Sequence, residues 1–107
     1  MNATAELLDE RAMSKLKWRC RRGLLENDLL IEKFFKRHEA TLTVSQAQGL
    51  NDLMDLSDND LLDLLLQRRE PGQLAEVSAQ VSASTHAARE VLNLIRATVT
   101  GHQSAPI

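Results

Sequence analysis

The sequence predicts an all-α fold, a small bundle of about five short helices. Apolar residues recur at intervals of three and four along most of the chain, and no segment shows the strict alternation of a half-buried strand. The two prolines, Pro71 and Pro106, lie outside the strongly periodic segments. At 107 residues and 43% hydrophobic content, the chain has room for one small domain with a single modest core.

The first predicted helix begins near Ala5 or Ala12 and ends at about Arg22. Gly23 follows its last turn, so we expect this glycine to end the helix as a left-handed C-terminal cap. The arginines of the last turn would then interact favourably with the helix dipole. Part of the basic character of this helix end is therefore explained by structure alone.

The second predicted helix begins near Asn27 or Asp28, because either side chain can cap its first amide groups. One apolar stripe follows, formed by Leu30, Ile31, Phe34, Phe35, His38 and Leu42. Since His38 continues this stripe, we expect a partly buried imidazole there and not a general base.

The third predicted helix starts at a capping box, in which Thr43 is followed three residues later by Gln46. Its apolar positions are Val44, Ala47, Leu50, Leu53 and Met54. We expect Gly49 to weaken this helix slightly, because glycine has a low helix propensity.

The fourth predicted helix repeats the capping signal with Ser57 and Asp60. It is short and leucine-rich from Leu61 to Leu66, which predicts burial on most sides, and it ends before Pro71 and Gly72.

One long final helix is predicted from Leu74 to Val99. Its middle, from Ser78 to Ala88, is rich in Ser, Ala and Thr, so we expect propagation from both ends to maintain it there. The predicted organisation is an N-terminal extension over 1–13 that is helical or disordered, a helical domain over 14–100, and a disordered tail over 101–107.

Composition excludes several classes of protein. The net charge of -2 gives no whole-protein reason to expect a nucleic-acid or membrane partner. A single cysteine, Cys20, excludes a disulfide framework and a zinc site of clustered Cys and His. The acidic first ten residues do not resemble a secretory signal, and no apolar run is long enough to span a bilayer. These observations predict a cytoplasmic protein.

We find no pattern that predicts catalysis. The three histidines, His38, His86 and His102, are far apart, and no Ser or Cys has the spacing of an activated nucleophile. Cys20 is expected to be a small core residue. The glycines form neither a phosphate-binding loop nor a dinucleotide fingerprint, so we expect no tightly bound FAD. The sequence predicts a protein that is not an enzyme and has no catalytic residue.

Acidic residues gather between the third and fourth predicted helices. They are Asp52, Asp55, Asp58, Asp60 and Asp63. Their spacing lacks the central glycine and terminal glutamate of an EF-hand loop, so we expect no metal site. Capping and the helix dipole explain the acids at the helix start.

A basic cluster surrounds the single tryptophan, Trp18, and no acidic residue interrupts it. Its members are Lys15, Lys17, Arg19, Arg21 and Arg22. Cations beside an indole can engage phosphate or stack on a planar ring, which would make this cluster a binding surface. The alternative interpretation of the cluster is a solvated helix end with a half-buried tryptophan. Gly23 allows another backbone to approach closely, and Glu26 is near enough in sequence to pair with Arg22. Together these features predict a docking surface.

Trp18, Arg21 and the run Arg22-Gly23-x-x-Glu26 resemble the R-G-x-x-E signature of the SdhE/YgfY family of succinate dehydrogenase assembly factors. The resemblance extends from about Lys15 to Pro71. Further supporting features are Phe34-Phe35, Leu42 and Asp60-Leu61-Leu62.

This resemblance implies a small helical protein that binds the flavoprotein subunit of succinate dehydrogenase, and in bacteria also that of fumarate reductase. Such a protein promotes covalent attachment of FAD to a histidine of the client, and the FAD belongs to the client. The resemblance further implies roles for the residues of this motif and for their basic and aromatic neighbours. Arg22 and Gly23 would face the flavoprotein, Glu26 would orient Arg22 or meet a basic group, and Trp18 with Arg19 or Arg21 would anchor the rim.

The alternative hypothesis is a small helical nucleic-acid-binding domain, or a general protein-interaction domain, that uses the first helix as its basic element. The cations cluster at one helix end instead of along a face, and the net charge is slightly acidic. Both observations favour a protein partner, so we expect neither nucleic-acid binding nor membrane insertion.

Overall fold

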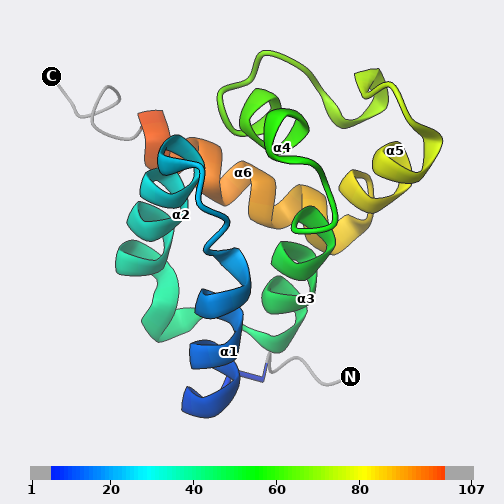
Figure 1. Ribbon diagram of the computed structural model, residues 1–107. Coiled ribbons are helices and arrows are strands. Elements are labelled where there is room, and N and C mark those ends of the chain that lie inside the picture. Colours follow the sequence, from blue (N-terminus) through cyan, green and yellow to red (C-terminus); the bar gives the residue numbers. More distant parts are fainter. Residues whose placement is uncertain (1–5, 101–107) are drawn as a thin grey trace, which may run out of the picture.

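The computed structural model describes residues 6–100, and within this range it contains six α-helices and two short 3-10 helices (Figure 1). The α-helices are α1 (Glu10–Cys20), α2 (Leu25–His38), α3 (Val44–Leu53), α4 (Asp58–Leu65), α5 (Val77–Ala83) and α6 (His86–Thr100). The 3-10 helices are η1 (Glu39–Thr41) and η2 (Pro71–Gln73). The predicted all-α fold is confirmed, with six helices where about five were expected.

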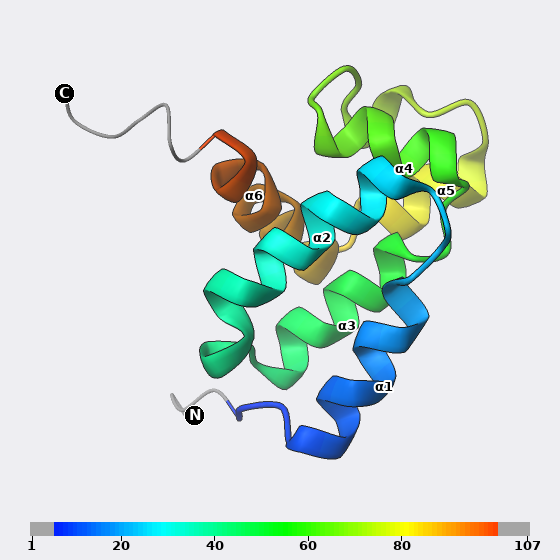
Figure 2. The ribbon, with the colours of Figure 1, turned by 60° about the vertical axis from the view of Figure 1, so that its left-hand side comes forward.

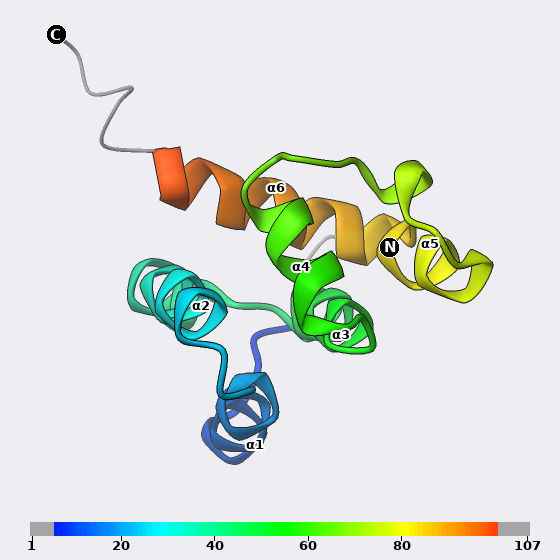
Figure 3. The ribbon, with the colours of Figure 1, turned by 45° about the horizontal axis from the view of Figure 1, so that its top comes forward.

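The core lies where α6 crosses α2, α3 and α4. α6 contacts α2, α3 and α4, while α1 packs at the side of the molecule away from α6 (Figures 2 and 3). Most of the fully buried large side chains come from α2, α3, α4 and α6, and they include Phe34, Leu50, Leu53, Leu61, Leu64, Val91 and Ile95. Burial of this apolar surface is the main stabilising term of the fold.

The chain is already ordered ahead of the predicted helical domain. Residues 6–9 run beside the segment before α3, where Leu8 N donates to Leu42 O at 2.9 Å and Val44 N donates to Glu6 O at 2.8 Å. Asp9 then caps α1 by accepting a hydrogen bond from Ala12 N at 2.8 Å. Residues 1–5 and the predicted tail over 101–107 lie outside the described residues.

The predicted end of the first helix is wrong. α1 stops at Cys20, and Arg21 already has extended backbone angles, with φ -84° and ψ 105°. Gly23 does adopt a left-handed conformation, at φ +89°, but it bends the linker between α1 and α2 instead of capping α1. The helix ends early because hydrogen bonds to α2 and α4 hold Arg22 and Gly23 in the linker.

The predicted start of the second helix is also wrong. α2 begins at Leu25, and its N-cap Leu24 offers no side-chain hydrogen bond. Asn27 is buried inside the helix, and Asp28 accepts hydrogen bonds from linker amides instead of capping its own helix. Asn27 and Asp28 therefore have partners elsewhere in the structure and do not cap the first amide groups of α2.

The capping signals of the third and fourth helices are confirmed. Thr43 Oγ1 accepts from Gln46 N, and Gln46 Oε1 accepts from Thr43 N, both at 3.0 Å. Ser57 Oγ accepts from Asp60 N at 3.2 Å. Of the apolar residues of this helix, Ala47, Leu50, Leu53 and Met54 are buried, while Val44 at its start is 45% exposed.

The prediction of one long final helix is wrong, because the segment divides into α5 and α6 at Ser84 and Thr85. Thr85 Oγ1 accepts from Ala88 N at 3.0 Å, which caps α6, and it donates to Asp52 Oδ2 of α3 at 2.8 Å. The Ser and Thr of this region favour caps over helix interiors, so a cap at Thr85 that is also bonded to α3 outcompetes helix continuation, although the alanines beside it favour helix.

Gly49 permits the close approach of α3 and α6. A Cβ atom at this position would lie 2.1 Å from Ala87 O and 2.4 Å from Ala87 C. The sequence predicted only a weakened helix there. The structure instead requires the missing side chain, because the two backbones touch at this crossing.

We expect Gly49→Ala to destabilise the protein by about 3 kcal/mol or more, since the new methyl group must push backbone against backbone. Urea denaturation followed by far-ultraviolet circular dichroism measures the change. Gly72→Ala is the matched control, because a Cβ there meets nothing within 4 Å. Equal stability of the two variants would contradict the tight α3–α6 crossing.

Candidate docking site

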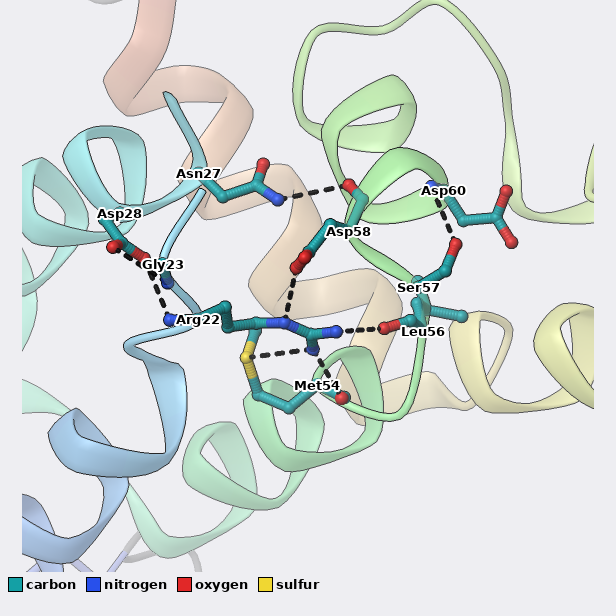
Figure 4. Close-up of polar contacts among 9 residues, drawn as sticks. All are labelled: Arg22, Gly23, Asn27, Asp28, Met54, Leu56, Ser57, Asp58 and Asp60. Carbon is teal, nitrogen blue, oxygen red and sulfur yellow. Dashed lines mark hydrogen bonds and ion pairs between the residues drawn. The ribbon is translucent and has the colours of Figure 1, made fainter. Parts of the chain in front are cut away.

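The sequence-predicted site residues lie together at the corner between α1 and α2, which we define as residues 18–28. Trp18 and Arg19 are in the last turn of α1, Arg21 to Gly23 form the linker, and Glu26 is in the first turn of α2. The corner lies beside the α3–α4 turn (Figure 4). All six predicted residues therefore belong to this corner.

Arg22 reaches inward from the corner and binds the α3–α4 turn with its whole guanidinium group (Figure 4). Its Nε donates to Asp58 Oδ1 at 2.8 Å, its Nη1 donates to Met54 O at 2.6 Å, and its Nη2 donates to Leu56 O at 2.6 Å. The side chain is only 19% exposed. Three charge-assisted bonds with little solvent competition make this a strong tie between the corner and α4.

Asp28 fastens the linker from the α2 side. Its carboxylate accepts from Arg22 N at 3.1 Å and from Gly23 N at 3.3 Å. The linker backbone is therefore held by α2 while the Arg22 side chain is held by the α3–α4 turn. Gly23, exposed and left-handed, lies at the outside of this clamp, and a Cβ there would meet nothing within 4 Å.

Asn27 adds a second contact to the same residue of α4. Its side chain is fully buried, and Nδ2 donates to Asp58 O at 3.1 Å. Its Oδ1 has no hydrogen-bond partner among the described residues. Asp58 therefore accepts two hydrogen bonds from the corner, one at its carboxylate from Arg22 and one at its backbone carbonyl from Asn27.

Arg19 connects the end of α1 to the end of α3. Its Nη2 donates to Asp55 Oδ1 at 3.0 Å and lies 3.5 Å from Asn51 O. Both side chains of this ion pair are about half exposed, at 48% and 57%, so its contribution to stability is about 0–1 kcal/mol.

The remaining predicted residues point to solvent. Trp18 is 72% exposed, and the guanidinium carbon of Arg21 lies 5.7 Å from its ring centroid. Glu26 is exposed and makes no ion pair among the described residues, so the carboxylate that pairs with Arg22 is Asp58 instead of Glu26. Leu25, which is 69% exposed, lies beside them in the sequence.

The acidic residues between α3 and α4 are largely occupied by internal partners. Besides the bonds to Asp55 and Asp58, Arg69 lies 3.2 Å from Asp63 and 4.0 Å from Asp60, and Asp52 accepts from Thr85. Across residues 6–100, no three His, Cys, Asp or Glu side chains are grouped so as to hold a metal ion. The acidic patch is therefore in part the internal counterpart of the basic cluster.

Cys20, the last residue of α1, is the part of the corner that is buried in the core. Burial raises the pKa of its thiol to about 12, and the nearby Arg19 and Arg22 only partly offset this effect. The thiol is therefore protonated at neutral pH, as a structural core cysteine should be.

Sequence reasoning missed three residues that build the site, namely Asn27, Asp28 and Asp58. The first two were assigned to a helix cap, and Asp58 was assigned to the dipole of α4. One signal was available: a basic cluster and an acidic cluster in a single small domain predict that some of their members pair with each other.

The chain matches a known protein family over a range that includes the corner. The family profile described as "Flavinator of succinate dehydrogenase" (Sdh5) matches residues 14–98. The chain is similar to the FAD assembly factor SdhE of Ralstonia nicotianae, with 44% identity over 89 residues that cover 83% of this chain and 85% of that protein. No solved structure has a significant match to the chain.

Shorter alignments relate the chain to two further proteins named FAD assembly factor SdhE. The one from Legionella pneumophila strain Paris is 39% identical over 64 residues, covering 60% of this chain and 81% of that protein. The one from Coxiella burnetii is 40% identical over 60 residues, covering 56% of this chain and 73% of that protein.

We expect Arg22→Met to destabilise the protein by about 2–3 kcal/mol, because it leaves Asp58 and two carbonyl groups without their donor. Arg21→Met, which removes a cation from the exposed neighbour, should change stability by less than about 0.5 kcal/mol. Chemical denaturation of both variants provides the comparison. If Arg22→Met were as stable as Arg21→Met, the guanidinium would not be holding the corner.

We also expect Cys20 to resist alkylation by iodoacetamide in the native protein at neutral pH and to react readily in urea. The raised pKa and burial both suppress thiolate attack in the folded state. Mass spectrometry after timed quenching measures the difference. Equal rates in the two states would show that the thiol is accessible in the fold.

Proposed function

The chain belongs to the family of succinate dehydrogenase flavinators that includes SdhE, and we propose that it acts by docking its α1–α2 corner on the flavoprotein subunit. It is a FAD assembly factor and not an enzyme. One observation carries the assignment of the surface. The corner is held from inside by Arg22 and Asp28, while Trp18, Arg21, Leu25 and Glu26 on its outer face are exposed and form no ion pair among the described residues.

The outer face of the corner has the composition of an interaction hot spot. Trp18 and Arg21 form a stacked pair, and tryptophan and arginine are the side chains most enriched at the energetic centres of interfaces. Gly23 presents bare backbone between them and Glu26, so a partner chain can approach closely there. We propose that these four residues, with the exposed Leu25, contact the flavoprotein.

Arg22 and Arg19 have a different role in this proposal from the direct contact implied by the family resemblance. Their guanidinium groups are bonded to Asp58 and Asp55, so they hold the corner in its docking shape. A preformed surface loses less conformational entropy on binding, which increases affinity without adding contacts. Arg22 therefore supports docking chiefly through its neighbours.

FAD binding is assigned to the client. The chain has no glycine-rich phosphate loop, and the corner offers exposed side chains in place of an enclosed site for a dinucleotide. We propose that docking restricts the motion of the flavoprotein around its own cofactor site. Holding reacting groups in productive geometry accelerates a reaction through proximity, and this chain would contribute that effect alone.

The same surface argues against the nucleic-acid alternative. Within the described residues, three of the five cations in the basic cluster are already in ion pairs, since Lys17 binds Glu39, Arg19 binds Asp55 and Arg22 binds Asp58. Only Lys15 and Arg21 of the cluster remain for phosphates, which is too few for a strong electrostatic footprint.

Two finer expectations stay predictions. We propose the flavoprotein subunit of fumarate reductase as a second client, because the family resemblance implies it. No helix of residues 6–100 is long and apolar enough to cross a membrane. The cytoplasmic location expected from the sequence stays a prediction.

Co-expression with the succinate dehydrogenase flavoprotein subunit, in a host without its own assembly factor, tests the function. We expect wild-type protein to increase covalent flavin, read as in-gel fluorescence after denaturation. Gly23→Ala and Glu26→Gln should reduce the gain while leaving the helical circular dichroism spectrum intact, because neither position packs against the core and the backbone strain of an alanine at φ +89° falls on the linker between the helices.

Glu90→Gln is the matched control, since Glu90 is exposed on α6 and faces Gln46 at the opposite end of α3. It should behave as wild type. No gain with wild-type protein would contradict the assembly function itself. A full gain with both corner variants would retain the function but remove the corner as its docking surface.

A further inference from the structure

A second surface feature lies on the far side of the Arg22 tie. A pocket of about 360 Å³ opens between the start of α4 and the segment that leads into α5. Figure 4 draws Ser57 and Asp60 beyond Leu56 from Gly23, on the side toward α5. Leu56 belongs to both features, because its carbonyl binds Arg22 and the residue lines the pocket.

The lining combines an apolar surface with carboxylates and no basic residue. Ala75 and Ala79 supply apolar surface, and three acids, Asp55, Asp60 and Glu76, line the same pocket. This chemistry disfavours an anion. It suits a side chain with an aliphatic stem and a positive head, which is the amphipathic character of lysine and arginine.

The charges of the pocket are only partly compensated within the described residues. Asp55 pairs with Arg19, and Asp60 lies 4.0 Å from Arg69, at the outer limit of an ion pair. Glu76 has no ion pair, and as the N-cap of α5 it makes no side-chain cap bond. Like charges around one pocket repel each other, and a cation placed among them relieves that repulsion.

The dipole of α4 does not prevent such an occupant. The N-terminus of α4 has a positive end that by itself would repel a cation, but its first turn already contains Asp58 and Asp60. Asp58 is paired with Arg22, but Asp60 lines the pocket from that first turn, and together with Glu76 it offsets the partial charge of about half a unit at the helix end. The pocket therefore retains a negative character at its mouth.

We infer that this α4–α5 pocket receives a lysine or arginine side chain of the flavoprotein subunit when the corner docks. The inference rests on the proposed function. It is supported by charge complementarity and by continuity with the corner, because Arg19 binds Asp55 on the pocket rim and Arg22 binds the carbonyl of Leu56.

Binding of the purified flavoprotein subunit to variants of the full chain tests this inference, with the dissociation constant measured by biolayer interferometry. We expect Glu76→Lys to weaken binding by about tenfold or more, because it places a cation where the partner's cation binds. Ser78→Trp, at an exposed lining position, should weaken binding by filling the pocket. Glu76→Gln should reduce the salt dependence of binding.

Glu90→Lys changes the net charge by the same amount as Glu76→Lys and lies away from the pocket, so its affinity should stay within about twofold of wild type, which is under 0.5 kcal/mol. Thermal unfolding of each variant verifies that the fold is kept. Wild-type affinity of both Glu76→Lys and Ser78→Trp, with Gly23→Ala weakened, would overturn the pocket inference and retain the corner.

Two further outcomes would also overturn the inference. If wild-type protein does not bind the flavoprotein, the proposed function fails together with the pocket. If wild-type protein self-associates in sedimentation velocity and Glu76→Lys abolishes this association, the occupant is a second copy of the chain and not the flavoprotein.

Discussion

The side chain of Arg22 is the contact on which the arrangement of the functional surface depends. It leaves the linker after α1, crosses to the α3–α4 turn and binds two carbonyl groups and the carboxylate of Asp58. The carbonyl groups of a helix end normally need water or a cap, and here one guanidinium satisfies two carbonyls of the turn after α3. Because Asp28 holds the linker amides at the same time, the linker cannot shift without breaking bonds to α2 and to the α3–α4 turn.

This tie changes how the charged residues of the chain are understood. The sequence contains what look like two separate sites, a basic cluster around Trp18 and an acidic patch between α3 and α4. In the fold, Arg19 and Arg22 pair with Asp55 and Asp58, so much of each cluster is used by the other. What is left for recognition is smaller and more specific than either cluster. The corner keeps an indole, one arginine, bare glycine backbone and one carboxylate, while the acidic surplus collects at the pocket beside α5.

Local signals in the sequence were sufficient for the fold class and for some helix starts, and tertiary contacts decided the rest. The capping box at Thr43 was predictable because its two hydrogen bonds join residues three apart. The break before α6 was not, since Thr85 gains its advantage from a partner on α3. Gly49 reads as a weak helix position until its neighbour across the crossing is known. For the site, all six residues could be placed at one corner, but the inward direction of Arg22 depended on Asp58, which is distant in the sequence.

The exposed indole at the corner has a spectroscopic consequence. Trp18 is the single tryptophan of a chain without tyrosine, so its ring accounts for nearly all of the protein's near-ultraviolet absorption and intrinsic emission. Since the ring is 72% exposed, its emission is that of a water-contacting indole in the free protein. The stacked Arg21 also makes the signal sensitive to rearrangement of its nearest cation. Trp18 fluorescence therefore reports, without a label, on the surface where a partner would exclude water. Rearrangements of the core that do not reach Trp18 should change this fluorescence little.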